Sequence, residues 1–358
     1  MRTARVVAVL ASAAVVSVLV VGLVALREDE QRPPPRGPVA VTPPGPTSSA
    51  PSPETGTVLD ELPHGAAPAI GYVEDHVYVA PGGRRTALPR DRGISAVTPL
   101  GQRFLVADTR VFEGSIGLAL VDRSGTRVDE WCSSGAPVVS ADRRLTAWVT
   151  FPCLESLDTG TTRVHRSTTE GSGRRQTSQH VGRRAPITVV GFLGDDVVVD
   201  GAWEERGYLT DLVSAPRPIA GLTWLGSVDE VGGLVAGQRG TDGEQAVVLD
   251  PRTGMHRWQA PHVYLGEFNP DGSLIAGQDG DDWSVFDRVG SVAYRLDLPS
   301  RSQLFSMAWE DERHLLAVIT SRGSIAVVRF GPGGEAEIAA PVVHYDPNDP
   351  AYVLSAQP

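Results

Sequence analysis

A short motif recurs along the chain at intervals of about forty residues, and this repetition constrains the fold more than any other feature. Each copy consists of a polar turn followed by an apolar residue that begins a strand-like run. These apolar residues, the anchors of the repeat, are Phe104, Leu145, Val197, Leu234, Leu274 and Leu315, spaced by 41, 52, 37, 40 and 41 residues. A period of about 40 to 45 residues is typical of the blades of a β-propeller. The sequence therefore predicts an all-β ring of sequential blades.

The segments between the anchors support four short strands in each blade. Runs of Val, Ile, Leu and aromatic residues are broken every eight to twelve residues, roughly, by Gly, Pro, Asp or Asn. A second turn also recurs in three copies, where Asp122, Asp250 and Asp287 are each followed by a glycine three or four residues later. Aspartate caps such turns with its side chain, and glycine supplies a positive φ. We therefore interpret these aspartates as structural.

The ends of the repeat region bear on the number of blades. Six full units fit between residues 93 and 340, which leaves two strands before them, within 69–89, and a tail at 341–358. Propellers commonly close by combining strands from both termini in one blade, because closure removes the exposed edges of an open ring. Joining the two remaining pieces makes a seventh blade. We therefore favour seven blades over six.

Three segments resemble a known family. The run Pro137-Val-Val-Ser-Ala-Asp-Arg-Arg-Leu-Thr-Ala-Trp-Val149 and the run Phe268-Asn-Pro-Asp-Gly-Ser-Leu-Ile-Ala276 resemble the repeat of the TolB-type and WD-repeat-like β-propellers, and residues 170–177 resemble the turn between its third and fourth strands. The resemblance implies a propeller over about residues 70 to 340. Because the motif residues form turns, and the family includes scaffolds, binding modules and accessory domains of enzymes, the resemblance does not define a function.

The N-terminus carries an uninterrupted apolar run. Residues 6–26 contain only Ala, Val and Leu apart from two serines and one glycine. As a helix these 21 residues span about 31 Å, which matches the hydrocarbon core of a bilayer at about 30 Å. Arg2 and Arg5 precede the run and residues 28–30 are acidic, so the positive-inside rule places residues 1–5 in the cytoplasm. We predict a single-pass signal anchor in the cell membrane with the bulk of the chain outside, in a membrane-anchored bacterial version of the propeller family; a cleaved signal peptide is the alternative.

Residues 27–56 differ sharply in composition from the segments on either side. They contain nine prolines among Thr, Ser, Gly and charged residues. Such a segment favours an extended, disordered linker of about 3.1 Å per residue, which is long enough to hold the next domain up to about 90 Å from the membrane. The extracytoplasmic β-propeller is then predicted to occupy residues 57–358.

Composition and missing motifs limit the possible functions. The chain has 32 basic residues, none of them lysine, and a net charge of −11. The absence of lysine excludes Schiff-base chemistry and a P-loop, and the acidic balance argues against nucleic-acid binding. The sequence holds no Gly-x-Ser-x-Gly, His-Glu-x-x-His or Gly-x-Gly-x-x-Gly motif, so we assign no catalytic residue and no cofactor.

Three groups of residues remain as candidate sites. The only cysteines are Cys132 and Cys153, and an isolated pair in an exported domain is most simply a disulfide. Closely spaced carboxylates are a weak calcium candidate, and a cluster of arginines in the longest repeat interval is a candidate for contact with an anionic envelope polymer or lipid head group. The carboxylates are Asp279, Asp281 and Asp282, and the arginines are Arg174, Arg175, Arg183 and Arg184.

Two classes of function are consistent with this sequence. We favour a binding or scaffold module displayed outside the membrane, which recognises an envelope component or a protein partner. The alternative is an envelope enzyme that hydrolyses glycans or peptides at the mouth of the propeller channel. That alternative requires two carboxylates converging from different blades.

Overall fold

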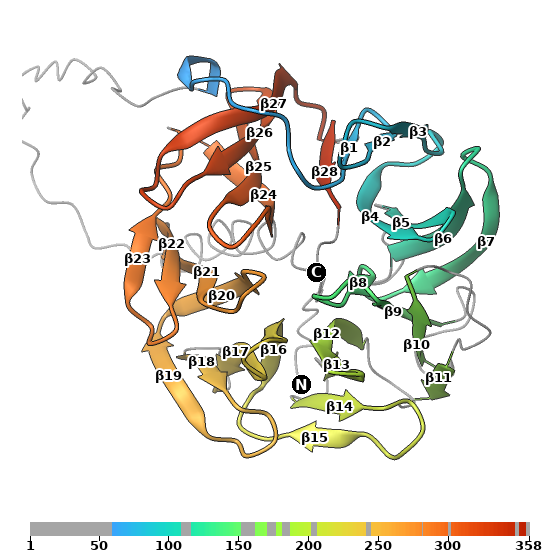
Figure 1. Cartoon of the computed structure of the whole chain (residues 1–358), viewed down its shortest axis with the longest axis vertical. Helices are drawn as coiled ribbons and strands as arrows, with labels where there is room; N and C mark the ends of the chain where they lie inside the picture. The colour runs from blue at the N-terminus through green and yellow to red at the C-terminus, as the bar shows by residue number, and fades with distance from the viewer. Residues whose placement is uncertain are drawn as a thin grey trace, which may run out of the picture.

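The computed structural model describes residues 59–108, 116–151, 162–169, 177–180, 187–201, 206–240, 245–280, 282–299, 302–347 and 351–355. Over these residues the chain forms seven four-stranded antiparallel sheets arranged around a central channel (Figure 1). The predicted β-propeller is confirmed, with seven blades. Within the described ranges the helical structure is one 3-10 turn, η1 (Leu59–Glu61), and no helix there is long and apolar enough to cross a membrane. The predicted anchor and linker lie outside these ranges.

The blades follow one another along the chain, and the strands of each are named from the innermost to the outermost. Blade 1 contains β28 (Tyr352–Leu354), β1 (Tyr72–Glu74), β2 (Val77–Val79) and β3 (Arg85–Ala87); blade 2 contains β4 (Ile94–Leu100), β5 (Arg103–Asp108), β6 (Ile116–Asp122) and β7 (Arg127–Ser133); blade 3 contains β8 (Val138–Val139), β9 (Leu145–Thr150), β10 (Arg163–Thr168) and β11 (Thr177–His180); blade 4 contains β12 (Thr188–Leu193), β13 (Asp196–Gly201), β14 (Arg206–Thr210) and β15 (Arg217–Ile219).

The remaining three blades have the same order of strands. Blade 5 contains β16 (Trp224–Asp229), β17 (Leu234–Arg239), β18 (Gln245–Leu249) and β19 (His256–Pro261); blade 6 contains β20 (Val263–Phe268), β21 (Leu274–Asp279), β22 (Asp282–Asp287) and β23 (Val292–Arg295); blade 7 contains β24 (Ser302–Trp309), β25 (Leu315–Ser321), β26 (Ser324–Phe330) and β27 (Ala336–His344).

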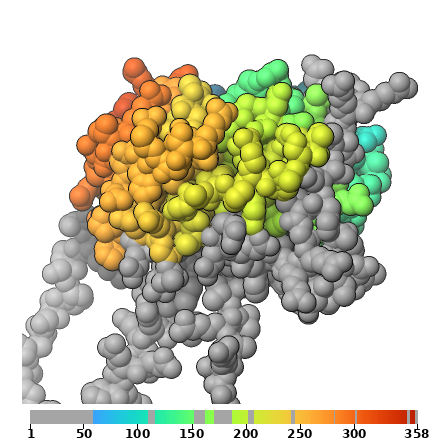
Figure 2. All heavy atoms as spheres, turned by 90° about the horizontal axis from the view of Figure 1, so that it is seen from below, coloured from blue at the N-terminus to red at the C-terminus, as the bar shows by residue number. Residues whose placement is uncertain are grey.

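The six anchors of the sequence repeat occupy equivalent positions. Each is the first or second residue of the second strand of its blade, from β5 in blade 2 to β25 in blade 7. Phe104, Val197 and Leu315 are buried, and the other three are half-buried. The apolar side chains of the second strands pack between neighbouring blades. For example, Val197 and Phe192 lie in one cluster with Val149 of blade 3. The rim of the ring, with blades 4 and 5 side by side in yellow, is seen in Figure 2.

Blade 1 closes the ring by joining the two ends of the described chain. The last strand, β28, pairs with β1 along a register that places Tyr72 opposite Leu354, and the two lie side by side in red and blue in Figure 1. The prediction of a blade shared by both termini is confirmed. It differs in one detail, because the N-terminal piece supplies three strands and not two. The third strand, β3, is short and alternates exposed and half-buried residues, so its sequence carries no hydrophobic pattern.

The repeated aspartates make the turns that the sequence predicts. Asp122 Oδ1 accepts hydrogen bonds from the main-chain N–H groups of Ser124 and Thr126, both at 2.9 Å. Asp287 Oδ1 accepts from the two corresponding N–H groups in blade 6, also at 2.9 Å. Asp250 accepts at 2.8 Å from Arg252. These carboxylates hold the turn between the third and fourth strands and are engaged in doing so.

The chain that leads into the ring is fastened to the outside of blade 7. His64 forms a parallel bridge with Ile338 of the outermost strand, β27. The Gly65 N–H donates to the Ile338 carbonyl at 2.9 Å, and the Ile338 N–H donates to the Pro63 carbonyl at 2.8 Å. Leu59 of η1 is buried in the core of blade 7. This segment therefore covers an outer edge that would otherwise expose unpaired main-chain groups; Figure 1 shows it in blue crossing the red blade.

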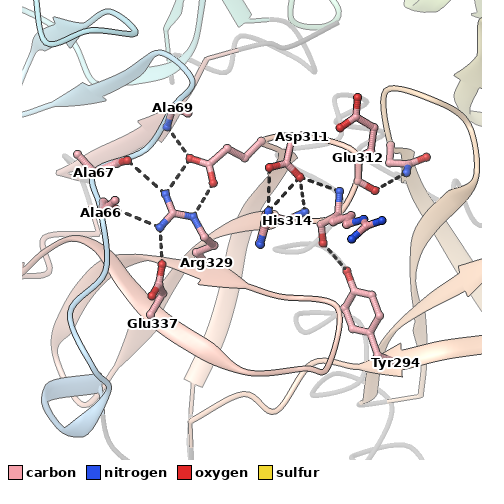
Figure 3. Close-up of polar contacts among 12 residues, drawn as sticks. Ala66, Ala67, Ala69, Tyr294, Asp311, Glu312, His314, Arg329 and Glu337 are labelled. Carbon is pink, nitrogen blue, oxygen red and sulfur yellow. Dashed lines mark hydrogen bonds and ion pairs between the residues drawn. The ribbon is translucent and has the colours of Figure 1, made fainter.

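Arg329 of β26 joins this entering segment to blade 7 (Figure 3). Its guanidinium makes two hydrogen bonds to Glu310, at 2.5 and 2.9 Å, and one to Glu337. It also donates to the carbonyl oxygens of Ala66 and Ala67, at 3.1 and 3.2 Å. The side chains of Arg329 and Glu310 are only 11% and 5% exposed. The two carboxylates raise the pKa of the guanidinium above its usual value, so the arginine is a permanently charged centre of this fastening.

Candidate functional site

The central channel is an enclosed surface in the middle of the ring. It is lined by the innermost strands of the blades and contains a cavity of about 210 Å³. All seven blades contribute to its wall, which is mostly apolar with a minority of polar side chains. Concave, mainly apolar sites with a few placed polar groups are the usual form of a small-molecule site. The channel is therefore the candidate site.

A repeated irregularity shapes the wall of the channel. The pairing of the first and second strands shifts by one residue in blades 2, 4, 5, 6 and 7. A β-bulge of this kind bends the strand and re-aims the side chains next to it. In four of these blades the residue that follows the shift is small and lines the cavity: Ala96, Gly191, Ser227 and Ser306. In blade 6 the shifted segment holds Glu267.

Glu267 is thus a single long carboxylate in a layer of short side chains. It is half-buried because its side chain reaches the channel space, and no group among the described residues donates a hydrogen bond to its carboxyl. Burial alone raises the pKa of this carboxyl to about 7. A carboxyl without a donor in an apolar setting is costly to ionise. No residue in the described ranges therefore serves as a partner for this carboxyl.

Ser227, in the neighbouring blade, supplies a second unpartnered group. The residue is 5% exposed, and its Oγ has no hydrogen-bond partner. Buried hydroxyl groups are nearly always hydrogen-bonded, so an exception that borders a cavity calls for an explanation. Ser227 and Glu267 line the same cavity, but the Ser227 Oγ is itself closed off from it.

The other carboxyl in the channel is already engaged. Glu230, in the turn after β16, accepts a hydrogen bond from the Ala141 N–H of blade 3 at 2.9 Å. Burial raises its pKa to about 7, and this bond opposes the shift. Neither of the two carboxyls, Glu230 and Glu267, shifts the pKa of the other. The two carboxyls come from adjacent blades, but they do not act as a coupled pair.

Aromatic side chains line the cavity near the ends where the first strands begin. Trp224 opens β16, and its six-membered ring lies 3.1 Å from the point where a Cβ on Gly226 would be. Tyr264, near the start of β20, is 39% exposed. Cross-strand pairing places Gln278 between Tyr264 and Trp283, so these three side chains form a row across blade 6. This row and Trp224 make one mouth of the channel aromatic.

Two buried polar residues at the ends of second strands have a structural role. Asp200 Oδ1 accepts a hydrogen bond from the Leu225 N–H of the next blade at 3.1 Å. Gln238 Nε2 donates to the Val263 carbonyl of the blade after that, at 2.8 Å. These bonds connect blade 4 to blade 5 and blade 5 to blade 6. Asp200 is fully buried, and its second oxygen has no partner.

Because Asp200 is buried, we predict that the free energy of unfolding falls as pH rises. Burial raises its pKa to about 7 in the folded chain, against an ordinary value of 3.8. The folded state then binds more protons than the unfolded state between these values, so stability is fully present below about pH 4 and is lost as pH rises through about 7. Asp200→Asn should remove about 3 kcal/mol of this dependence between pH 5 and pH 8, measured by urea unfolding. An unchanged pH slope in the variant would contradict the assignment.

None of the sequence-predicted site residues that the structure describes lines the channel. Cys132 lies in β7, and the Phe151 N–H donates to its carbonyl at 2.9 Å, whereas Cys153 lies outside the described ranges. Asp279 and Asp282 face each other across the hairpin of blade 6, and Asp282 lies 3.7 Å from Arg295. Asp281 and all four candidate arginines, Arg174, Arg175, Arg183 and Arg184, also fall outside the described ranges. No cluster of three metal-ligating side chains occurs among the residues that are described.

The residues that do line the site were not identified from the sequence. Glu267 and its small counterparts precede the anchors of their repeats by between 6 and 9 residues. The turn lengths vary and each bulge adds one residue, so a fixed spacing does not align them. The signal that remains is a lone acidic residue in an otherwise apolar first strand, in the segment Tyr264-Leu-Gly-Glu-Phe268.

Comparison with known proteins bears on the fold alone. No family model matches the chain, and no curated protein matches it in sequence. Among solved structures, it is similar to a chain of the mitotic checkpoint complex, at 13% identity and a TM-score of 0.48, over 80% of this chain and 95% of that one. BamB from Moraxella catarrhalis is 13% identical, with a TM-score of 0.38 over 74% and 95% of the two chains. Acylaminoacyl peptidase from Pyrococcus horikoshii is 14% identical, with a TM-score of 0.49 over 74% and 47%. The pairing of the strands, independently of these likenesses, establishes the propeller.

Proposed function

We propose that the protein is a membrane-anchored, extracytoplasmic β-propeller that acts as a binding or scaffold module for an envelope component or a protein partner, and that the channel is its binding site. The observation that carries the proposal is the layer of small side chains around Glu267, a carboxyl to which no described residue donates a hydrogen bond. A wall of this kind leaves room for a ligand and offers it hydrogen-bonding groups.

A channel-filling variant tests the binding site. The full chain, in mild detergent, is immobilised and exposed to an envelope extract, alongside Ser306→Leu, which extends a side chain into the cavity. We expect a component that the unaltered protein retains to be lost from the variant. Val213→Thr, at a residue that is 80% exposed outside the channel, is the matched control and should retain it. Equal retention by Ser306→Leu, with an unchanged melting curve, would overturn the channel as the site.

The location is supported by the apolar run at 6–26 and the charges that flank it. We expect protease added to intact spheroplasts to digest the propeller, because the bulk of the chain is placed outside. Detection by an antibody against the propeller, with a cytoplasmic protein as the control for intact cells, gives the result. Complete protection of the propeller would contradict the proposed topology.

The cysteine pair is a second indication of an oxidising compartment. Main-chain pairing places Phe151, two residues before Cys153, beside Cys132. We propose that the two cysteines form a disulfide, and we expect a Cys132→Ser, Cys153→Ser double variant to lose about 2 to 4 kcal/mol and melt several degrees lower. Calorimetry and thiol titration of the native protein provide the measurements. Quantitative titration of both thiols in the exported protein would contradict the disulfide.

An envelope enzyme acting on glycans or peptides is the second candidate. One observation favours it: two carboxyls from different blades, Glu230 and Glu267, line one channel, and burial raises the pKa of each to about 7. The binding function is preferred because Glu230 is held by Ala141 and the two carboxyls are not coupled. Hydrolysis of envelope glycan or peptide that Glu267→Gln abolishes, while binding persists, would favour the enzyme.

A further inference from the structure

The Glu267 carboxyl, which has no donor among the described residues, identifies the chemistry of the ligand. This inference rests on the proposed binding function and specifies it further. The Glu267 carboxyl accepts hydrogen bonds when ionised and has no donor. A carboxylate of this kind in an apolar wall is satisfied by a group that carries N–H donors.

The absence of positive charge in the cavity favours a cationic donor. Glu230 and Glu267 are the charged side chains among the residues that line it, and both are acidic. An arginine that neutralises a buried carboxylate is found elsewhere in this protein, where Arg329 pairs with Glu310 and Glu337. In the two blades beside Glu267, the residues at the bulge are Ser227 and Ser306, which carry no charge. A positively charged ligand supplies the partner for Glu267 that the described residues of blade 6 do not provide.

The aromatic mouth suits the same ligand. Trp224 lies over Gly226, at the depth of the bulge, because a Cβ on Gly226 would stand 3.1 Å from the indole ring and 2.9 Å from the Leu265 carbonyl. Tyr264 and Trp283 lie on the adjoining blade and border the same cavity. Aromatic faces attract ammonium and guanidinium groups, and tryptophan does so most strongly. A cation that enters through this mouth contacts aromatic rings before it reaches the Glu267 carboxylate.

We infer that the channel binds a small organic cation, a protonated amine, with Glu267 accepting its N–H groups and Trp224 and Tyr264 flanking its path. The cavity of about 210 Å³ lies below the range of about 300 to 1,000 Å³ that drug-sized ligands occupy. The ligand is therefore a small amine, or the amine end of a longer molecule that extends through the mouth.

The acid–base properties of the site support this assignment. Other titratable groups near Glu267 are Glu230 and Tyr264 in the cavity, and Asp229, Arg239 and Asp279 at the ends of the strands packed against or paired with β20. None of them contributes to the raised pKa of Glu267, which burial alone produces. A bound cation must therefore displace the proton of Glu267 below about pH 7. Its affinity should fall by about tenfold between pH 8 and pH 6.

Calorimetric titration of the full chain with n-butylammonium tests the inference. Butylammonium stays protonated from pH 6 to pH 8, because its amine resembles that of lysine. We expect it to bind at pH 8, with n-butanol, a neutral molecule of the same shape, at least tenfold weaker. Glu267→Gln should weaken butylammonium at least tenfold and abolish the pH dependence. Asp60→Asn, which removes an exposed charge outside the channel, should have no effect.

The outcomes separate this inference from the proposed function. Equal binding of n-butanol and butylammonium would show an apolar pocket and overturn the cation. Undetectable binding of butylammonium, together with an envelope component whose retention Ser306→Leu abolishes, would overturn the amine and leave the binding function standing. Tetramethylammonium, which has no N–H donor, tests the hydrogen bonds separately. Binding as tight as that of butylammonium would overturn the hydrogen bonds assigned to Glu267 and leave a site of aromatic contact only. Melting curves of all variants verify that they fold.

Discussion

Arg329→Ala is expected to lower the free energy of unfolding by about 3 to 5 kcal/mol. The Arg329 side chain is 11% exposed and donates hydrogen bonds to Glu310, Glu337 and two carbonyl groups of the entering segment (Figure 3). Its removal leaves two carboxylates, one of them 5% exposed, without their partner. Uncompensated buried charge is the costly consequence of breaking such a cluster. Urea unfolding at pH 7 measures the loss.

Two further variants identify the cause of that loss. Arg295→Ala removes an arginine whose side chain is 73% exposed and 3.7 Å from Asp282, and it should cost less than about 1 kcal/mol. Adding Glu310→Gln to Arg329→Ala removes the stranded charge and should recover part of the stability. A loss below about 1 kcal/mol for Arg329→Ala would show that the cluster does not fasten the entering segment.

Removal of residues 351–358 is expected to prevent the ring from closing. It deletes β28, whose three side chains, Tyr352, Val353 and Leu354, are all buried. Each contributes about 1.5 to 3 kcal/mol, so the total is comparable with the whole stability of a typical domain, about 5 to 15 kcal/mol. The truncation also exposes the edge of β1 and removes the Ser355 hydroxyl that donates to the Val97 carbonyl at 3.1 Å. We expect an aggregated product in size-exclusion chromatography.

A shorter truncation is the matched control. Removal of residues 356–358 alone leaves β28 and Ser355 in place, and this variant should elute and melt like the full chain. A peptide that supplies residues 349–358 in trans should restore part of the monomer, because it replaces the missing innermost strand. If the longer truncation melts like the full chain, the closing strand is not required.

The repeat, and therefore the blades, could be predicted from the sequence because both depend on local patterns. The anchors from Phe104 to Leu315 begin second strands since each follows a polar turn and starts an apolar run. Asp122 and Asp287 could be assigned to turns because their partners lie only two to four residues away. The strand β3 was missed for the converse reason. It is three residues long and its burial depends on its neighbours.

Local pattern, in short spacings of polar and apolar residues, thus determined the seven-bladed ring, its closure by both ends of the chain and the structural role of its turn aspartates. The tertiary structure alone decided that Glu267 lines one cavity with small residues from four other blades. It also decided that Ser227 Oγ lacks a partner and that Arg329 binds a segment more than 260 residues away in the sequence. The physical reason is that a channel wall is assembled from one residue of each blade, and bulges and turns of unequal length place these residues at unequal spacings in the sequence. The energy of such a contact depends on burial and on the missing partner, which follow from closure of the ring and not from neighbouring residues in the sequence.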